Sequence, residues 1–129
     1  MTLKDVKSEL REAIKWHETF MGYCPEWVEL IGETHPGAVI GYTQLRKAVY
    51  EEGHLTRKVK QLILLGINLA RNYKAGIDLH MKLAMDLGAT RAEIAETILT
   101  ATLSSAAPAH HEGGISLAAQ LKRKQKDKT

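Results

Sequence analysis

Hydrophobic residues recur along most of the chain at steps of three or four, the spacing that places side chains on one face of an α-helix. Leu3, Val6, Leu10 and Ile14 show it in the first segment. No segment of useful length alternates as a β-strand does, and no internal repeat is present. The pattern therefore predicts an all-α protein. Its expected helices are a first one from residue 3 to the break at 22–25, a second from 25 to 32–36, then 38–50, 56–72, 74–87, one from 90 towards 104–108, and 114–124.

Cap residues sharpen several of these boundaries. Thr2 and Thr56 are placed to accept hydrogen bonds from the first free amides of their helices. Thr90 and Glu93 have the spacing of a capping box, in which each side chain bonds the other residue's amide. Gly88 suits the left-handed position just after a helix.

The helix predicted over 56–72 is apolar nearly all round. Such a helix is usually buried on every side, inside a domain or between subunits. A helical chain of this size then has more apolar surface than a small bundle can bury alone, and self-association covers the excess. We therefore expect a homo-oligomer.

Length and composition describe one soluble globular domain. The chain has 129 residues, of which 44% are hydrophobic and 26% charged, against about 100–200 residues in a typical domain. We expect one helical domain over 1–121 and a basic C-terminal tail over 122–129. The tail carries five cations and one anion, so the net charge of +3 leaves −1 for the rest.

The concentration of positive charge in the C-terminal tail indicates which binding partners to expect. A nucleic-acid binder more often carries its cations on a folded face, so we expect no nucleic-acid partner. The tail is expected to be solvated, with contact to an acidic partner as the alternative.

Cys24 is the single cysteine of the chain. Because each of these needs two or more cysteines, a single cysteine excludes an internal disulfide, a cysteine-rich zinc module and a CxxC redox pair. We interpret it as a small buried hydrophobe, because no neighbouring cation would activate its thiol. With no apolar leader and no span of about 20 apolar residues, the sequence predicts a cytoplasmic protein that does not contact a membrane.

Three residues on one side of the fifth predicted helix could carry chemistry. His80 lies beside the apolar stripe, where an imidazole titrating near neutral pH suits acid–base catalysis; the alternative is a core histidine bonded to a carbonyl. Gly76 marks a close approach of a helix or a ligand. Tyr73 offers a hydroxyl, or is simply an aromatic at a helix end. Gln61, in an apolar neighbourhood, needs hydrogen-bond partners if it is buried.

A second cluster, His110, His111 and Glu112, lies beside two glycines. With His80 it could form a metal site, although the spacing is not that of a strong metal motif. Polar loop residues are the favoured interpretation, so no metal and no other cofactor is expected. We also interpret the stretch 51–54, with Glu51, Glu52 and His54, as a solvated loop.

The stretch Leu55–Leu65 and the run His80–Ile94 resemble the carboxymuconolactone decarboxylase and alkylhydroperoxidase D superfamily. The run H-x3-A-x3-G-A-T-x2-E-I is its most specific part, and the resemblance covers about residues 37–113. It implies an all-helical protein that forms trimers or hexamers.

The superfamily that the chain resembles has two branches with different chemistry. The peroxidase branch uses Glu-x11-Cys-x2-Cys-x3-His, and this pattern falls on Gln61, Tyr73, Gly76 and His80. Three of the four positions differ, so thiol peroxidase activity is not expected. The decarboxylase branch also lacks the cysteine pair and has a small-residue segment with a proline, which 106–109 resembles.

The resemblance implies a lyase-like proton-transfer site with His80, Tyr73 and Gln61 as site residues and a small carbonyl or lactone acid as ligand. Arg57, Lys58 and Arg71 are candidates to hold its carboxylate. A binding or structural member without catalysis, and a metal-binding protein, are the alternatives, because the scaffold does not determine the function.

Overall fold

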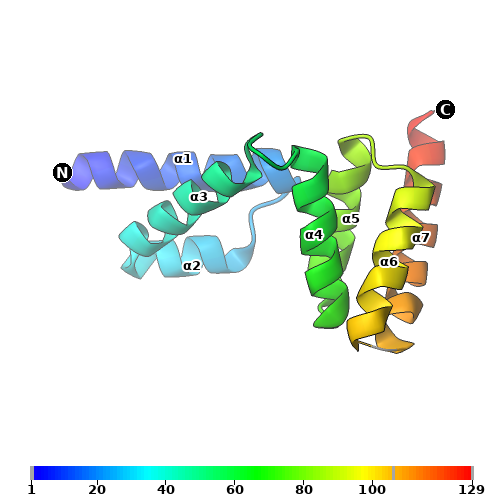
Figure 1. Ribbon diagram of the computed structural model, residues 1–129. Coiled ribbons are helices and arrows are strands. Elements are labelled where there is room, and N and C mark those ends of the chain that lie inside the picture. The colour runs from blue at the N-terminus through cyan, green and yellow to red at the C-terminus, as the bar shows by residue number, and fades with distance from the viewer. Residues whose placement is uncertain (1, 106, 129) are drawn as a thin grey trace. The chain divides into compact units, whose positions relative to one another are not determined.

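Helices make up nearly all of the structure, a computed structural model that describes residues 2–105 and 107–128. The predicted all-α class is confirmed, and the described residues contain no strand. The helices, coloured along the chain in Figure 1, are α1 Leu3–Met21, α2 Glu26–Thr34, α3 Pro36–Tyr50, α4 Arg57–Ala70, α5 Lys74–Asp86, α6 Arg91–Ser105 and α7 Ala107–Asp127.

The chain divides into two compact units. The first, Met1–Glu51, holds α1 to α3, and the second, Glu52–Thr129, holds α4 to α7. Each unit is described by itself below. The single domain expected over 1–121 stays a prediction.

The predicted caps are present. Thr56 Oγ1 accepts from the amide of Val59 at 3.2 Å. Thr90 and Glu93 exchange both hydrogen bonds of a capping box, at 2.9 and 3.1 Å. Gly88, just after α5, has a φ of 93°, a left-handed conformation that glycine adopts without steric cost. Local chemistry therefore positions the ends of α4, α5 and α6.

The core of the first unit is small. Its buried hydrophobic residues are Ala13, Val28 and Val39, one from each helix. Gly32 lets α2 approach Leu10, since a Cβ there would lie 2.8 Å from a Leu10 methyl group. Aromatic rings outside this core make further contacts within the unit.

These rings surround a cation in the first unit. The Arg46 guanidinium lies 5.5–5.7 Å from the ring centroids of Trp16, Tyr42 and Tyr50. It donates to the Tyr50 hydroxyl at 3.2 Å. Cation–π contacts of this kind stabilise by about 0.5–1 kcal/mol each at exposed sites.

The second unit has a larger core, formed mainly where α4, α5 and α6 meet. Its fully buried large side chains are Leu65, Leu69, Ile77, Met81 and Ile94. The fourth helix is not buried on every side within this unit, and its burial between subunits stays a prediction. Only one face of α4 enters the core, and other apolar side chains on it remain 47% exposed, namely Ile63 and Ile67.

The last helix is longer than predicted. It begins at Ala107 instead of residue 114 and ends at Asp127 instead of 124. The two glycines do not interrupt it, because Gly113 is where α7 packs directly on Ile98 of α6. The six residues 122–127, expected in a solvated tail, form the last turns of this helix.

Asp86 anchors these last turns. Its carboxylate lies 3.0 Å from Lys124 Nζ, 3.2 Å from Arg123 Nη2 and 3.0 Å from Lys82 Nζ. Burial raises the pKa of Asp86, but the hydrogen bonds from these cations outweigh burial and lower the pKa to about 2. The carboxylate therefore stays charged far below neutral pH.

We expect Asp86→Asn to loosen the end of α7, because the neutral amide loses the charge that Arg123 and Lys124 face. The change should lower the free energy of unfolding by less than about 1 kcal/mol, as for exposed ion pairs. Hydrogen exchange of residues 122–127 measures it. Asp127→Asn, which removes a more exposed partner of Arg123, is the matched control. Equal exchange in both variants would contradict the anchoring role.

No described helix is both long and apolar enough to cross a membrane.

Candidate functional site

His80 and Gln61 form a buried hydrogen-bonded pair between α5 and α4. His80 is 7% exposed and Gln61 2% exposed, so the prediction that His80 lies on a buried face is confirmed. His80 Nδ1 lies 2.8 Å from Gln61 Oε1. Gln61 thus has the partner that a buried amide requires.

This bond orients the imidazole. An amide oxygen accepts and does not donate, so Nδ1 carries the proton of the neutral ring and the lone pair lies on Nε2. The alternative of a buried core histidine bonded to a carbonyl also agrees with this geometry, because Gln61 Oε1 is an amide carbonyl oxygen. A neutral imidazole held in one tautomer is suited to proton transfer at Nε2.

Close packing surrounds Gly76, one turn before His80. A Cβ at this position would overlap the Asn68 amide and lie 2.9 Å from Tyr73 Cδ1. Asn68 is 6% exposed, and its Nδ2 donates to the Leu64 carbonyl at 2.8 Å. The expected close approach at Gly76 is therefore a contact with a neighbouring side chain on α4.

The sequence analysis did not single out Asn68. It follows Gln61 by seven residues, two turns along the same face of α4, within an otherwise apolar stripe. Two polar residues at that spacing on a buried helix face are the signal that could have identified it.

Tyr73 lies at the exposed edge of this region. It is the residue just before α5 and is 54% exposed. The Arg71 guanidinium lies 6.0 Å from its ring centroid. Asn72 between them has a φ of 54°, a left-handed turn that brings α4 back into α5. The Tyr73 ring and the Arg71 cation thus lie together at this turn.

The other two candidate cations have different surroundings. Lys58 Nζ is 2.9 Å from Glu93 Oε1, an ion pair between α4 and α6. Arg57 is exposed, and its amide donates to Glu52 Oε2 at 2.8 Å. Of the three, Arg71 lies in contact with a predicted site residue.

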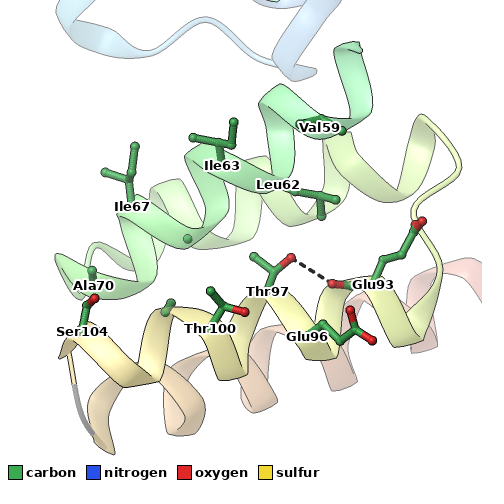
Figure 2. Close-up of a pocket in the computed structure, with 12 residues that line it drawn as sticks. Val59, Leu62, Ile63, Ile67, Ala70, Glu93, Glu96, Thr97, Thr100 and Ser104 are labelled. Carbon is green, nitrogen blue, oxygen red and sulfur yellow. Dashed lines mark hydrogen bonds between the residues drawn. The ribbon is translucent and has the colours of Figure 1, made fainter. Parts of the chain in front are cut away.

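A cavity of the second unit lies elsewhere. It has a volume of about 570 Å³ and lies between α4 and α6 (Figure 2). Neither His80, Tyr73 nor Gln61 lines it. Gln61 points from the core face of α4, whereas the cavity lies against another face of that helix. A pocket built around His80 therefore stays a prediction.

The alternative metal site is not assembled. Among residues 2–105 and 107–128, no three histidine, cysteine, aspartate or glutamate side chains gather closely enough to hold a metal ion. His110 and His111 are exposed on α7, and Glu112 is half-buried. They belong to a helix and not to the polar loop that we expected.

Cys24 lies in the first unit, half-buried beside its core. Burial raises the pKa of its thiol, and the nearby Glu29 and Glu18 carboxylates raise it further. Since the thiolate is the nucleophile, these surroundings agree with the interpretation of an unreactive cysteine.

A second buried histidine, His17, was also missed. It is fully buried in the first unit, and its Nδ1 donates to the Ala13 carbonyl at 2.8 Å. Its Nε2 has no hydrogen-bond partner among the described residues. Burial lowers the pKa of His17, the Ala13 bond opposes this effect, and Arg46 and Lys47 lower the pKa further.

This lowered pKa predicts acid sensitivity. Above about pH 6.5, the ordinary value, His17 is neutral in both folded and unfolded chains. Below it, the unfolded chain binds the proton first, so stability falls as the pH drops towards the folded-state pKa. His17→Phe should flatten this fall in melting temperature between pH 7 and 5, whereas His54→Phe, in an exposed loop, should not. An unchanged slope in His17→Phe would contradict the assignment.

The described residues thus define an all-α protein with a buried histidine–amide pair and no thiol in the neighbouring positions. Residues 36–112 match the carboxymuconolactone decarboxylase family. The chain belongs to this family.

Three relatives extend this finding. An uncharacterized protein of Methanocaldococcus jannaschii is 32% identical over 94 residues, which are 72% of this chain and 88% of that protein. A crystal structure from Burkholderia xenovorans, named for a carboxymuconolactone decarboxylase, has a TM-score of 0.79 at 24% identity and covers 96% of this chain and 98% of its own. The apo crystal structure of a carboxymuconolactone decarboxylase family protein from Legionella pneumophila has a TM-score of 0.65 at 23% identity. It covers 86% of this chain and 93% of its own. At these identities the two structures establish the shared fold.

Proposed function

We propose that the protein is a proton-transfer enzyme of the lyase or isomerase type that uses His80 without a thiol and acts on a small carbonyl or lactone acid. The observation that supports this most is the buried 2.8 Å hydrogen bond from His80 Nδ1 to Gln61 Oε1. It favours one tautomer of the imidazole that we propose as the functional residue.

The proposed step moves one proton at Nε2. The neutral ring takes a proton from the carbon beside a carbonyl, and the C–H electron pair moves onto the carbonyl oxygen as an enolate. Return of the proton to another carbon gives an isomer. A substrate with a carboxylate on the carbon beside the carbonyl loses CO2 instead, and the electron pair of the broken C–C bond forms the enolate. For that reaction His80 first takes a proton from solvent at Nε2, then gives it to the carbon that the carboxylate leaves, and returns to the neutral ring.

Arg71 and Tyr73 are proposed to hold the acid group of the substrate. They lie together at the turn between α4 and α5, and the Tyr73 ring edge lies beside Gly76, one turn from His80. The guanidinium suits a carboxylate, and the phenol can donate to its second oxygen. Lys58 is less suited, because Glu93 already pairs with it.

A panel of cyclic lactone acids and keto acids tests the proposal. Ligands that raise the melting temperature are then assayed for product by chromatography and for released CO2. Arg71→Gln should weaken the stabilisation by acids, and Arg91→Gln, another exposed arginine, serves as the control. Ligands that bind without turnover would favour the alternative, a non-catalytic binding member of the family.

Thiol peroxidase activity is not proposed, because tyrosine and glycine stand where the peroxidase branch has cysteines. We expect no reductant-dependent peroxide consumption by either the native chain or Cys24→Ser. If Cys24→Ser removed such an activity, the proposed chemistry would be wrong.

We also propose that the protein acts as a homo-trimer or hexamer in the cytoplasm, without nucleic acid, metal or other cofactor. Ile63 and Ile67 are each 47% exposed on α4, and the first unit buries few hydrophobic residues. A further copy would remove this surface from water. A stable monomer in sedimentation at micromolar concentration would contradict the assembly.

A further inference from the structure

His17 is a buried basic group that the proposed chemistry at His80 does not use. It lies in α1 of the first unit and is fully buried. Its Nδ1 donates to the Ala13 carbonyl at 2.8 Å, so the neutral ring has its lone pair on Nε2. Nε2 has no hydrogen-bond partner among the described residues. A buried polar atom without a partner is rare in folded proteins and calls for an explanation.

Two tryptophan rings and two cations surround the imidazole. The Trp16 ring of α1 and the Trp27 ring of α2 stand nearly perpendicular to it, with centroids at 5.1 and 6.0 Å. From α3, the positive charges of Arg46 and Lys47 act on His17. The three helices therefore present the ring with aromatic side chains, a carbonyl that is already bonded, and positive charge.

Protonation of Nε2 is unfavourable in these surroundings. The new N–H would be a buried donor without an acceptor, and the ring would carry a buried charge near two other cations. Burial lowers the pKa of His17, the bond to Ala13 opposes this effect, and Arg46 and Lys47 lower the pKa further. In the unfolded chain the same imidazole takes up its proton at about pH 6.5. Acid therefore favours states in which His17 reaches water.

The first unit has little hydrophobic burial to oppose such a state. Its buried hydrophobic residues are Ala13, Val28 and Val39, whereas the second unit buries several large side chains. Burial of apolar surface is the main force that keeps a helical unit closed. Because the chain divides into two compact units, the less stable one can open by itself.

We propose that His17 acts as a proton-sensitive switch, whose protonation opens helices α1 to α3 while the second unit keeps its fold. Neutral His17 keeps the first unit closed, and charged His17 opens it. Opening takes up one proton, so the open fraction should rise about tenfold for each pH unit between about pH 6.5 and the pKa of the folded state. The acid sensitivity expected of His17 is thereby assigned to one part of the chain.

Hydrogen exchange of the full chain at pH 7, 6 and 5, corrected for the intrinsic exchange rate at each pH, tests the proposal. The opening constant of amides in α1 to α3 should rise about tenfold per pH unit. That of amides in α4 to α6 should change much less. Trp16 and Trp27 are the two tryptophans of the chain, so tryptophan fluorescence reports on the first unit alone.

His17→Phe cannot take up a proton and should remove the acid-dependent rise in α1 to α3. His35→Phe, the same change at an exposed position of this unit, should keep it. Lys47→Glu tests the switch without altering the core. A carboxylate near His17 stabilises the imidazolium in the folded state, so the rise should become smaller. Lys7→Glu, at an exposed position of α1, is the matched control.

Two results would overturn the proposal. Equal acceleration of both units in acid would show a single global unfolding. A rise that persists in His17→Phe, or that Lys47→Glu and Lys7→Glu leave equally large, would assign the proton uptake to another group. His80→Ala should show the same acid response in α1 to α3 as the native chain, so failure of this proposal and failure of the proposed catalysis are distinguishable.

Discussion

In an assay with a substrate that the native protein turns over, His80→Ala is expected to lower kcat about 10²- to 10⁴-fold, the usual contribution of a positioned acid–base group. The imidazole is the member of the buried pair with Gln61 that can take up a proton. Without it, neither nitrogen remains to take or return the proton. His54→Ala, the same change in the exposed loop after Glu52, should leave kcat unchanged.

Stability must be measured beside activity. Removal of the imidazole leaves Gln61 Oε1 buried without this donor, which costs about 1–3 kcal/mol. Circular dichroism of His80→Ala should still show the helical spectrum at 20 °C. A folded variant with unchanged kcat/KM would remove His80 from the mechanism.

Gln61 acts through His80, so its role is positioning. Gln61→Glu replaces the neutral acceptor by a carboxylate, which stabilises the protonated imidazole. The pH–rate profile should shift to higher pH, with little change in KM. Gln61→Leu should lose activity without such a shift. Identical profiles for the native chain and Gln61→Glu would show that the bond has only a structural role.

The neighbouring glycines of α7 should respond in opposite directions to alanine. A Cβ at Gly113 would lie 2.8–3.1 Å from three carbons of Ile98, which is 5% exposed in the core. Overpacking of this kind costs about 1–3 kcal/mol, against a gain of about 1 kcal/mol in helix propensity. Gly113→Ala should therefore destabilise the second unit by up to about 2 kcal/mol.

Gly114→Ala is the control, one residue along the same helix. Nothing lies within 4 Å of the Cβ that it would add, so the propensity gain of up to about 1 kcal/mol remains. Denaturant unfolding of the three proteins measures both effects. If the two variants shift the midpoint in the same direction, the contact between α7 and Ile98 is wrong.

Helix positions were largely predictable, because their signals are local. Periodic hydrophobic residues and the capping box at Thr90 and Glu93 act within a few residues of one another. The start of α7 was not predictable from local signals. His110, His111 and the glycine pair favour a loop locally, and packing against α6 keeps this segment helical. Its last turns likewise depend on Asp86, far away in sequence.

In the candidate site, too, some features follow from the local sequence and others depend on tertiary packing. The inward direction of His80 follows from helical spacing, and Gln61 follows from the family pattern. The position of Asn68 against Gly76 and the cavity between α4 and α6 depend on how neighbouring helices meet. No short-range pattern encodes those distances.

The contact between Asn68 and Gly76 has an evolutionary consequence. In the peroxidase branch a cysteine stands at this position, but here any side chain would collide with a buried amide that is itself held by the Leu64 carbonyl. The double change Tyr73→Cys and Gly76→Cys would introduce both thiols of that branch, yet the second side chain would have no space until Asn68 became smaller. Introducing the cysteine pair into this chain therefore also requires a compensating substitution at Asn68.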